Sequence, residues 1–252
     1  MKYFILILGL LVSTLNSGQV KHQYSDLELE NLVFQEFDQL LMKTWIDAKQ
    51  KKSSNFTQYN NQINSEWQRI KKQIRSIELP HVDNKEFIKD LDYFMTLLDK
   101  SSSISDYNNV EKLSYHIMYE FRSLRQCYFY SEYPLDQLWD VIDVHSEIDF
   151  TIDDPMMDLK EWFEFEDMVN LMICNWETYD LLHISEIDGF FMGFNKEKHN
   201  AIKERVNSCI FSLLKAIETS FQDNFESPCD ELGYALEDLI KLYAYTRPSG
   251  LM

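Results

Sequence analysis

The stretch EWFEFEDMVNLMICNWETYDLLH, residues 161–183, decides the fold class because its large side chains recur at a helical interval. Successive members are separated by alternating steps of three and four residues, which places them on one face of a helix. The members of this seam are Trp162, Phe165, Val169, Met172, Trp176, Tyr179 and His183. A seam of this length predicts a long amphipathic helix that is buried along one side.

The same helical periodicity extends outward from this segment through most of the chain. Only 6 glycines and 5 prolines interrupt the 252 residues, and strand-like alternation is scarce. We expect helices at about 25–52, 63–79, 84–100, 106–132, 134–148, 155–184 and 195–223, and a last one from about 228. The predicted fold is an all-α, antiparallel bundle of about eight helices. The alternative is that the helices form two four-helix halves that meet near residue 133.

The N-terminal segment MKYFILILGLLVSTLNSGQV has the pattern of a secretory signal peptide. Lys2 precedes an apolar run from Tyr3 to Val12, and the small residues Ser17 and Gly18 follow. We expect a signal peptide at 1–18, a helical domain at 19–252, and export to a periplasmic or extracellular location. No later stretch approaches the ~20 apolar residues of a membrane span, so none is expected after cleavage. In a eukaryotic source, Asn55 would be a glycosylation acceptor.

Charge and cysteine spacing restrict the classes of function. The formal net charge is −18, which disfavours binding to nucleic acid. The four cysteines, Cys127, Cys174, Cys209 and Cys229, form no Cys-x-x-Cys motif, and their disulfide pairing is left open. If the last two helices form an antiparallel hairpin, Cys209 and Cys229 lie about 20 Å apart, so a bond between them is disfavoured.

Acidic residues are concentrated between residues 132 and 167, where thirteen carboxylates accompany a single lysine. On a helix, Asp136, Asp140, Asp143 and Glu147 fall on one face, and His145 points to the opposite, apolar face. We predict that these carboxylates form a solvated stripe, with a calcium site as the alternative. The segment 43–75 carries a net charge of +6 and offers a counter-surface for them.

A second set of residues faces inward among apolar neighbours and has no obvious structural duty. Its members are His116, Glu120, His145, Asp180 and His183. The simpler interpretation bonds each histidine to a core tyrosine or to backbone, and pairs Glu120 with an arginine or histidine. The alternative is a metal- or haem-binding bundle in which these side chains converge between helices.

The connection IDGFFMGFN, residues 187–195, is apolar for a loop between helices. Its side chains Phe190, Phe191, Met192 and Phe194 would form a docking tip or a ligand gate if they are exposed. The alternative is that the loop folds over the end of its own bundle and completes the core.

Sequence motifs of the common enzyme classes are absent. The chain contains no Gly-x-Ser-x-Gly, no His-Glu-x-x-His and no glycine-rich phosphate loop. The question of catalysis therefore stays open but leans against an enzyme, and no cofactor is expected. The function predicted from sequence is that of an exported acidic bundle that binds a protein or a small apolar ligand.

Overall fold

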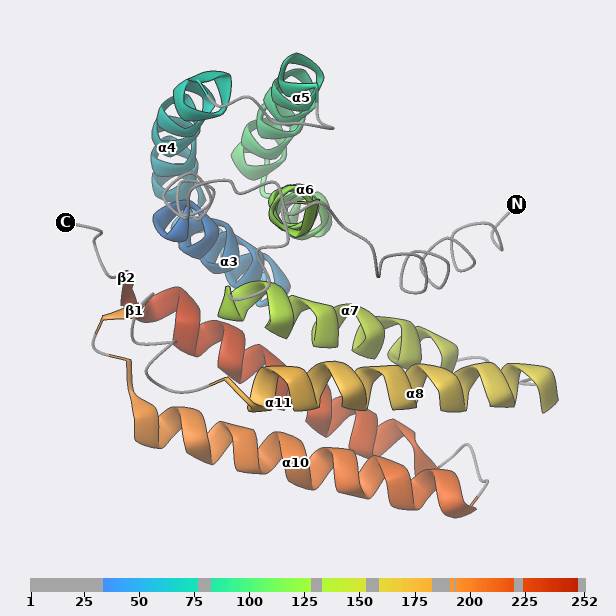
Figure 1. Cartoon of the computed structure of the whole chain (residues 1–252). Coiled ribbons are helices and arrows are strands. Elements are labelled where there is room, and N and C mark those ends of the chain that lie inside the picture. The colour runs from blue at the N-terminus through green and yellow to red at the C-terminus, as the bar shows by residue number, and fades with distance from the viewer. Residues whose placement is uncertain are drawn as a thin grey trace, which may run out of the picture.

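The computed structural model describes residues 34–76, 83–127, 133–152, 159–182, 191–192, 194–219 and 224–248. Within these ranges the chain forms eight helices and one pair of two-residue strands (Figure 1). The helices are α3 (Gln35–Lys49), α4 (Phe56–Ser76), α5 (Asn84–Ser103), α6 (Tyr107–Cys127), α7 (Pro134–Ile152), α8 (Leu159–Asp180), α10 (Lys196–Thr219) and α11 (Glu226–Tyr245). The all-α prediction is confirmed, whereas residues 1–18 lie outside the described part.

Two groups of four helices pack on each other through α3. In the first group α3, α4, α5 and α6 pack in sequence, and α6 returns to lie along α3. In the second group α7 packs on α8 and α11, and α10 packs on α11; Figure 1 shows these four helices running back and forth lengthwise. Because α3 also packs on α11, it belongs to the cores of both groups.

The apolar seams expected from the sequence lie in this core. On α8, Phe165, Met172 and Tyr179 are buried. On α4, α10 and α11, apolar residues that recur at the same steps of three and four are buried as well; they are Ile63, Trp67, Ile70, Ile74, Ile202, Val206, Cys209, Leu213, Ala216, Leu232, Leu236, Leu239 and Tyr243. On these four helices, spacing alone thus identified the face that turns inward.

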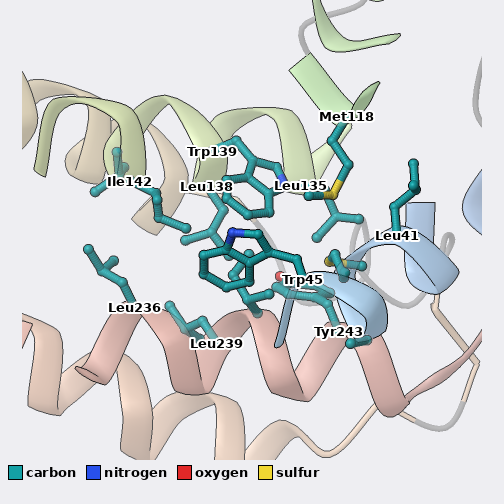
Figure 2. Close-up of a cluster of buried hydrophobic side chains, with 14 of the residues drawn as sticks. Leu41, Trp45, Met118, Leu135, Leu138, Trp139, Ile142, Leu236, Leu239 and Tyr243 are labelled. Atoms are coloured by element: carbon teal, nitrogen blue, oxygen red, sulfur yellow. The ribbon is translucent and has the colours of Figure 1, made fainter. Parts of the chain in front are cut away.

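The centre of the molecule is the place where α3, α7 and α11 meet. Figure 2 shows the Trp45 side chain of α3 between Trp139 and Ile142 of α7 and Leu236 and Leu239 of α11. Apart from Ile142, at 8%, these side chains are each 7% exposed or less. Tryptophan is large enough to contact two helices at once, so Trp45 joins the two groups.

The ends of the described chain are tied together by polar contacts. The Gln39 amide of α3 donates one hydrogen bond to the Tyr243 carbonyl at 2.8 Å and one to the Thr246 carbonyl at 2.6 Å. Both carbonyl groups lie at the C-terminal end of α11, where no further helical turn supplies donors, and the Tyr243 carbonyl also accepts a hydrogen bond from the Thr246 backbone N–H at 3.3 Å. Beyond this end, β2 (Arg247–Pro248) pairs antiparallel with β1 (Phe191–Met192), the one strand pair in the described residues.

The acidic stripe on α7 differs from the sequence prediction, because much of it faces α6 rather than water. Asp136 is 3% exposed and accepts two hydrogen bonds from the Arg125 guanidinium, at 2.6 and 2.7 Å. Arg122, one turn earlier on α6, lies 3.7 Å from Asp140 and also pairs with Asp143. The prediction of a solvated stripe is therefore wrong at Asp136, whereas the side chains of Asp140 and Asp143 are 40% and 25% exposed and Glu147 is exposed.

The physical reason is that α6 carries arginines three residues apart on the face that meets α7. Residues three apart share one face of a helix, so both arginines reach carboxylates of α7 at once. The segment 43–75 does not supply this counter-charge as expected; its cations pair elsewhere, as Lys49 does with Glu237 and Lys71 does with Asp92.

Two further expectations concern membranes and disulfides. None of the described helices combines the length and the apolarity that crossing a membrane requires. Cys209 is a buried thiol, so the disfavoured bond to Cys229 is not formed. The side chain of Cys127 lies outside the described residues.

Candidate functional site

A hollow of about 850 Å³ opens between α6 and α7, above α3. From α6 it is lined by residues one turn apart, Lys112, Tyr115 and Tyr119. From α7 it is lined along a stripe that runs from Trp139 to Thr151, and α3 contributes Trp45 and Lys49. One face of each of these helices therefore supplies the walls of the hollow.

Aromatic rings form the inner wall of this hollow. Trp45 and Trp139 meet edge to face with ring centroids 5.4 Å apart, and Tyr115 meets Trp139 in the same way at 5.7 Å. The Tyr115 hydroxyl donates a hydrogen bond to Asp143, whose other oxygen pairs with Arg122. The rings are therefore held by packing on one side and by a charged network on the other.

The rim of the hollow exposes apolar side chains to solvent. The Phe150 side chain on α7 is 81% exposed, and Tyr119 on α6 is 44% exposed. Both line the hollow, as does the half-buried Met168 of α8. Exposed aromatic residues around a concave aromatic wall are typical of sites that bind apolar groups.

A smaller hollow of about 190 Å³ adjoins the first and reaches α11. The two share Trp45, Lys49, Ile142 and Ser146, so one site spans both. The smaller part adds polar side chains from two helices: His145 and Asp149 from α7, and Asp230 and Glu237 from α11.

His145 is fixed across one turn of α11. Its Nε2 lies 2.9 Å from the Cys229 carbonyl oxygen, and because a carbonyl only accepts, Nε2 carries the proton. Burial lowers the pKa of His145, which keeps the imidazole neutral. The ring lies against Gly233, where a β-carbon would come within 2.9 Å of the imidazole Cε1.

The neighbouring thiol does not form a nucleophilic pair with this histidine. The Cys229 Sγ lies 3.5 Å from Nε2 and 3.8 Å from an Asp149 oxygen. A general base must present an unprotonated nitrogen to the thiol, and here the nitrogen nearest the sulfur is the one that donates to the carbonyl. The cluster is hydrogen-bonded packing between α7 and α11.

A cation lies at the boundary of the two hollows. The Lys49 ammonium is 4.7 Å from the centroid of the Trp45 ring and 3.5 Å from a Glu237 oxygen. Burial raises the pKa of Glu237, but hydrogen bonds from Lys241 and Lys49 and their charges outweigh it, so the pKa is lowered and Glu237 is ionised. For Glu111 across the hollow, burial dominates and raises the pKa, although Lys49 opposes the shift.

The residues that the sequence nominated for a metal or haem site have separate partners. His116 pairs with Glu120 at 3.5 Å on a partly exposed face of α6, so Glu120 is not buried as expected. Asp180 pairs with Lys203 of α10 at 2.6 Å, and His145 bonds to backbone. Among the described residues no group of three or more His, Cys, Asp and Glu is arranged to hold a metal ion. His183 lies outside them, so a site that uses it stays a prediction.

The aromatic loop is divided between core and undescribed positions. Phe191 and Phe194 are 0% and 5% exposed, and both rings contact Tyr243 of α11. These two side chains complete the core, as the alternative interpretation held. Phe190 and the side chain of Met192 lie outside the described residues, so a docking role for them stays a prediction.

Sequence reasoning missed the principal residues of the hollow, Trp45, Lys49, Tyr115 and Trp139. Tryptophan and tyrosine at helical spacing are normally interpreted as core residues, and the three aromatic rings of this set are indeed largely covered by protein. The signal that could have found them is positional. Aromatic residues at the edge of the apolar face, next to charged residues, mark a seam where helices separate.

Comparison with known protein families, with curated proteins and with solved structures finds no match to this chain. The function is therefore argued from the chemistry of the site.

Proposed function

We propose that the protein is an exported binding protein that holds a small molecule with a flat apolar body in the hollow between α6 and α7. The observation that carries the proposal is the aromatic wall of Trp45, Trp139 and Tyr115 inside a volume of about 850 Å³. Ligand pockets in proteins typically measure about 300–1,000 Å³ and are lined by aromatic side chains with a few polar groups.

The shape of the site favours a small molecule over a protein partner. A stable protein interface buries about 800 Å² of each partner over a broad surface. Here the apolar side chains instead converge on a concave wall. The proposal of export rests on the signal-peptide pattern of residues 1–18, and an acidic, soluble carrier is consistent with the net charge of −18.

A neutral fluorescent probe tests the proposal. N-phenyl-1-naphthylamine emits strongly in apolar surroundings, so titration should give a saturable increase with one site per chain. The variant Phe150→Ser with Tyr119→Ser removes apolar rim from the hollow. We expect it to raise the probe Kd about tenfold, because each aromatic contact contributes roughly 0.5–1.5 kcal/mol.

The matched control is Phe211→Ser with Tyr93→Ser. These residues are 59% and 61% exposed on α10 and α5, away from the hollow, so the substitutions have the same chemistry and similar exposure. The control should leave the Kd unchanged. Absence of saturable binding, or an equal loss of affinity in the two double variants, would reject the proposed site.

A further inference from the structure

We infer that the ligand of this site is an organic cation, and that the Lys49 ammonium occupies the position the cation takes. The inference rests on the proposed function, since it assigns a ligand class to the same hollow. It is supported by the charge of the lining and by the placement of Lys49.

The two hollows together are lined by six carboxylates and only two ammonium groups, those of Lys49 and Lys112. Two of the carboxylates are already paired, Asp143 with Arg122 and Glu237 with Lys241. The remaining carboxylates are Glu111, Glu147, Asp149 and Asp230. Because His145 is neutral, it does not offset them. An anionic ligand would meet repulsion here, whereas a cation would meet complementary charge.

Lys49 shows where a cation is stabilised in this site. Its ammonium lies over the face of the Trp45 ring, where the ring quadrupole attracts positive charge, and Glu237 approaches from α11. An aromatic face combined with a carboxylate is also the arrangement that recognises alkylammonium ligands. The lysine therefore marks a cation site between the two hollows.

The contact of Lys49 can be exchanged for that of a ligand. The side chain is 38% exposed, and its flexible stem allows the ammonium to turn outward into water. Glu237 keeps a second partner in Lys241 at 2.9 Å, so it stays ionised while the exchange takes place. A ligand ammonium attached to an apolar body would replace Lys49 over Trp45 and place the body against Trp139 and Tyr115.

Three probes that share a naphthalene body but differ in charge test this inference by isothermal titration calorimetry. They are 2-naphthylmethylammonium, 2-naphthylmethanol and 2-naphthoate. We expect the cation to bind about tenfold more tightly than the alcohol at low salt, and the carboxylate to bind most weakly. The preference for the cation should shrink as the salt concentration rises, because exposed charges are screened.

Substitution of Lys49 separates its role from general electrostatics. Lys49→Met keeps the apolar stem and removes the competing charge, so the affinity for the cation should rise roughly fivefold while that for the alcohol stays unchanged. The control is Lys43→Met on the same helix, whose ammonium lies over Tyr245 outside the hollow. Glu237→Gln should lower the affinity for the cation several-fold and leave the affinity for the alcohol unchanged.

The possible outcomes distinguish the two proposals. Equal binding of all three probes would overturn the cation assignment and leave the apolar site intact. Tighter binding of 2-naphthoate, or a Lys49→Met variant that binds the cation more weakly than the parent protein, would also overturn it. Failure of all three probes together with N-phenyl-1-naphthylamine would reject the site itself.

Discussion

Gly233 gives a sharp test of the packing between α7 and α11. Glycine in the interior of a helix costs about 1 kcal/mol relative to alanine, so propensity alone predicts that Gly233→Ala stabilises the protein. The structure predicts the opposite, because the new β-carbon would lie 2.9 Å from Cε1 of the His145 ring. Protein interiors are too closely packed to absorb such an overlap without displacement.

The cost of moving the ring is set by its hydrogen bond. A displaced His145 loses the 2.9 Å bond to the Cys229 carbonyl, and leaving a buried donor unsatisfied costs about 1–3 kcal/mol. Overpacking of a core costs a similar amount, and the two costs overlap because one movement relieves the clash and breaks the bond. After the gain in propensity of about 1 kcal/mol is subtracted, we expect Gly233→Ala to lower the free energy of unfolding by up to about 2 kcal/mol.

Urea denaturation of a double-mutant cycle measures this effect. In a His145→Ala background the ring is absent, so Gly233→Ala should become neutral or stabilising by up to about 1 kcal/mol. The coupling energy between the two positions should then be at least about 1 kcal/mol. Stabilisation by Gly233→Ala in the parent protein, or the same effect in both backgrounds, would refute the reasoning.

Further predictions concern buried charge. Burial raises the pKa of Asp38 to about 6, so the folded state binds this proton more tightly and its ionisation lowers stability as the pH rises through about 4–6. Burial lowers the pKa of His199 to about 4, which has the opposite effect, a loss of stability as the pH falls below about 6.5. Thermal unfolding should therefore show that the free energy of unfolding of Asp38→Asn falls by roughly 1–3 kcal/mol more than that of the parent protein between about pH 7.5 and about pH 5. Over the same interval the free energy of unfolding of His199→Gln should fall by less than that of the parent. Parallel pH profiles for the variants and the parent would contradict both assignments. Asp136→Asn should cost about 3–5 kcal/mol in chemical denaturation because it strips Arg125 of its closest partner, whereas Asp140→Asn, on a side chain that is 40% exposed, should cost under about 1 kcal/mol. Equal costs would show that burial does not decide the worth of these pairs.

The sequence predicted the elements of the fold because each helix carries its own periodic signal. The seam from Phe165 to Tyr179 and the proline at the start of α7 required no knowledge of the other helices. Partners across helices could not be found in this way. The Asp136 carboxylate is solvated or buried according to whether Arg125 faces it, and periodicity does not say which helix lies opposite.

The candidate site was harder to predict for a related reason. His145 was correctly placed on the inward face, but its partner, the carbonyl of Cys229, is a backbone group 84 residues away. Trp45 and Lys49 lie on α3 while Glu237 lies on α11, so the site exists only where the two helices come together. Residue types that carry no motif gain a function from this placement alone.

The packing of α3 on α11 also bears on how the chain folds as it is made. Gln39 and Tyr243 are 204 residues apart, and ribosomes add about 5–20 residues per second. For about 10–40 s of synthesis, therefore, the face of α3 that contains Trp45 has no partner from α11. During that interval the nascent chain exposes an apolar helix face that a chaperone can bind, and α11 covers this face only after it has been made.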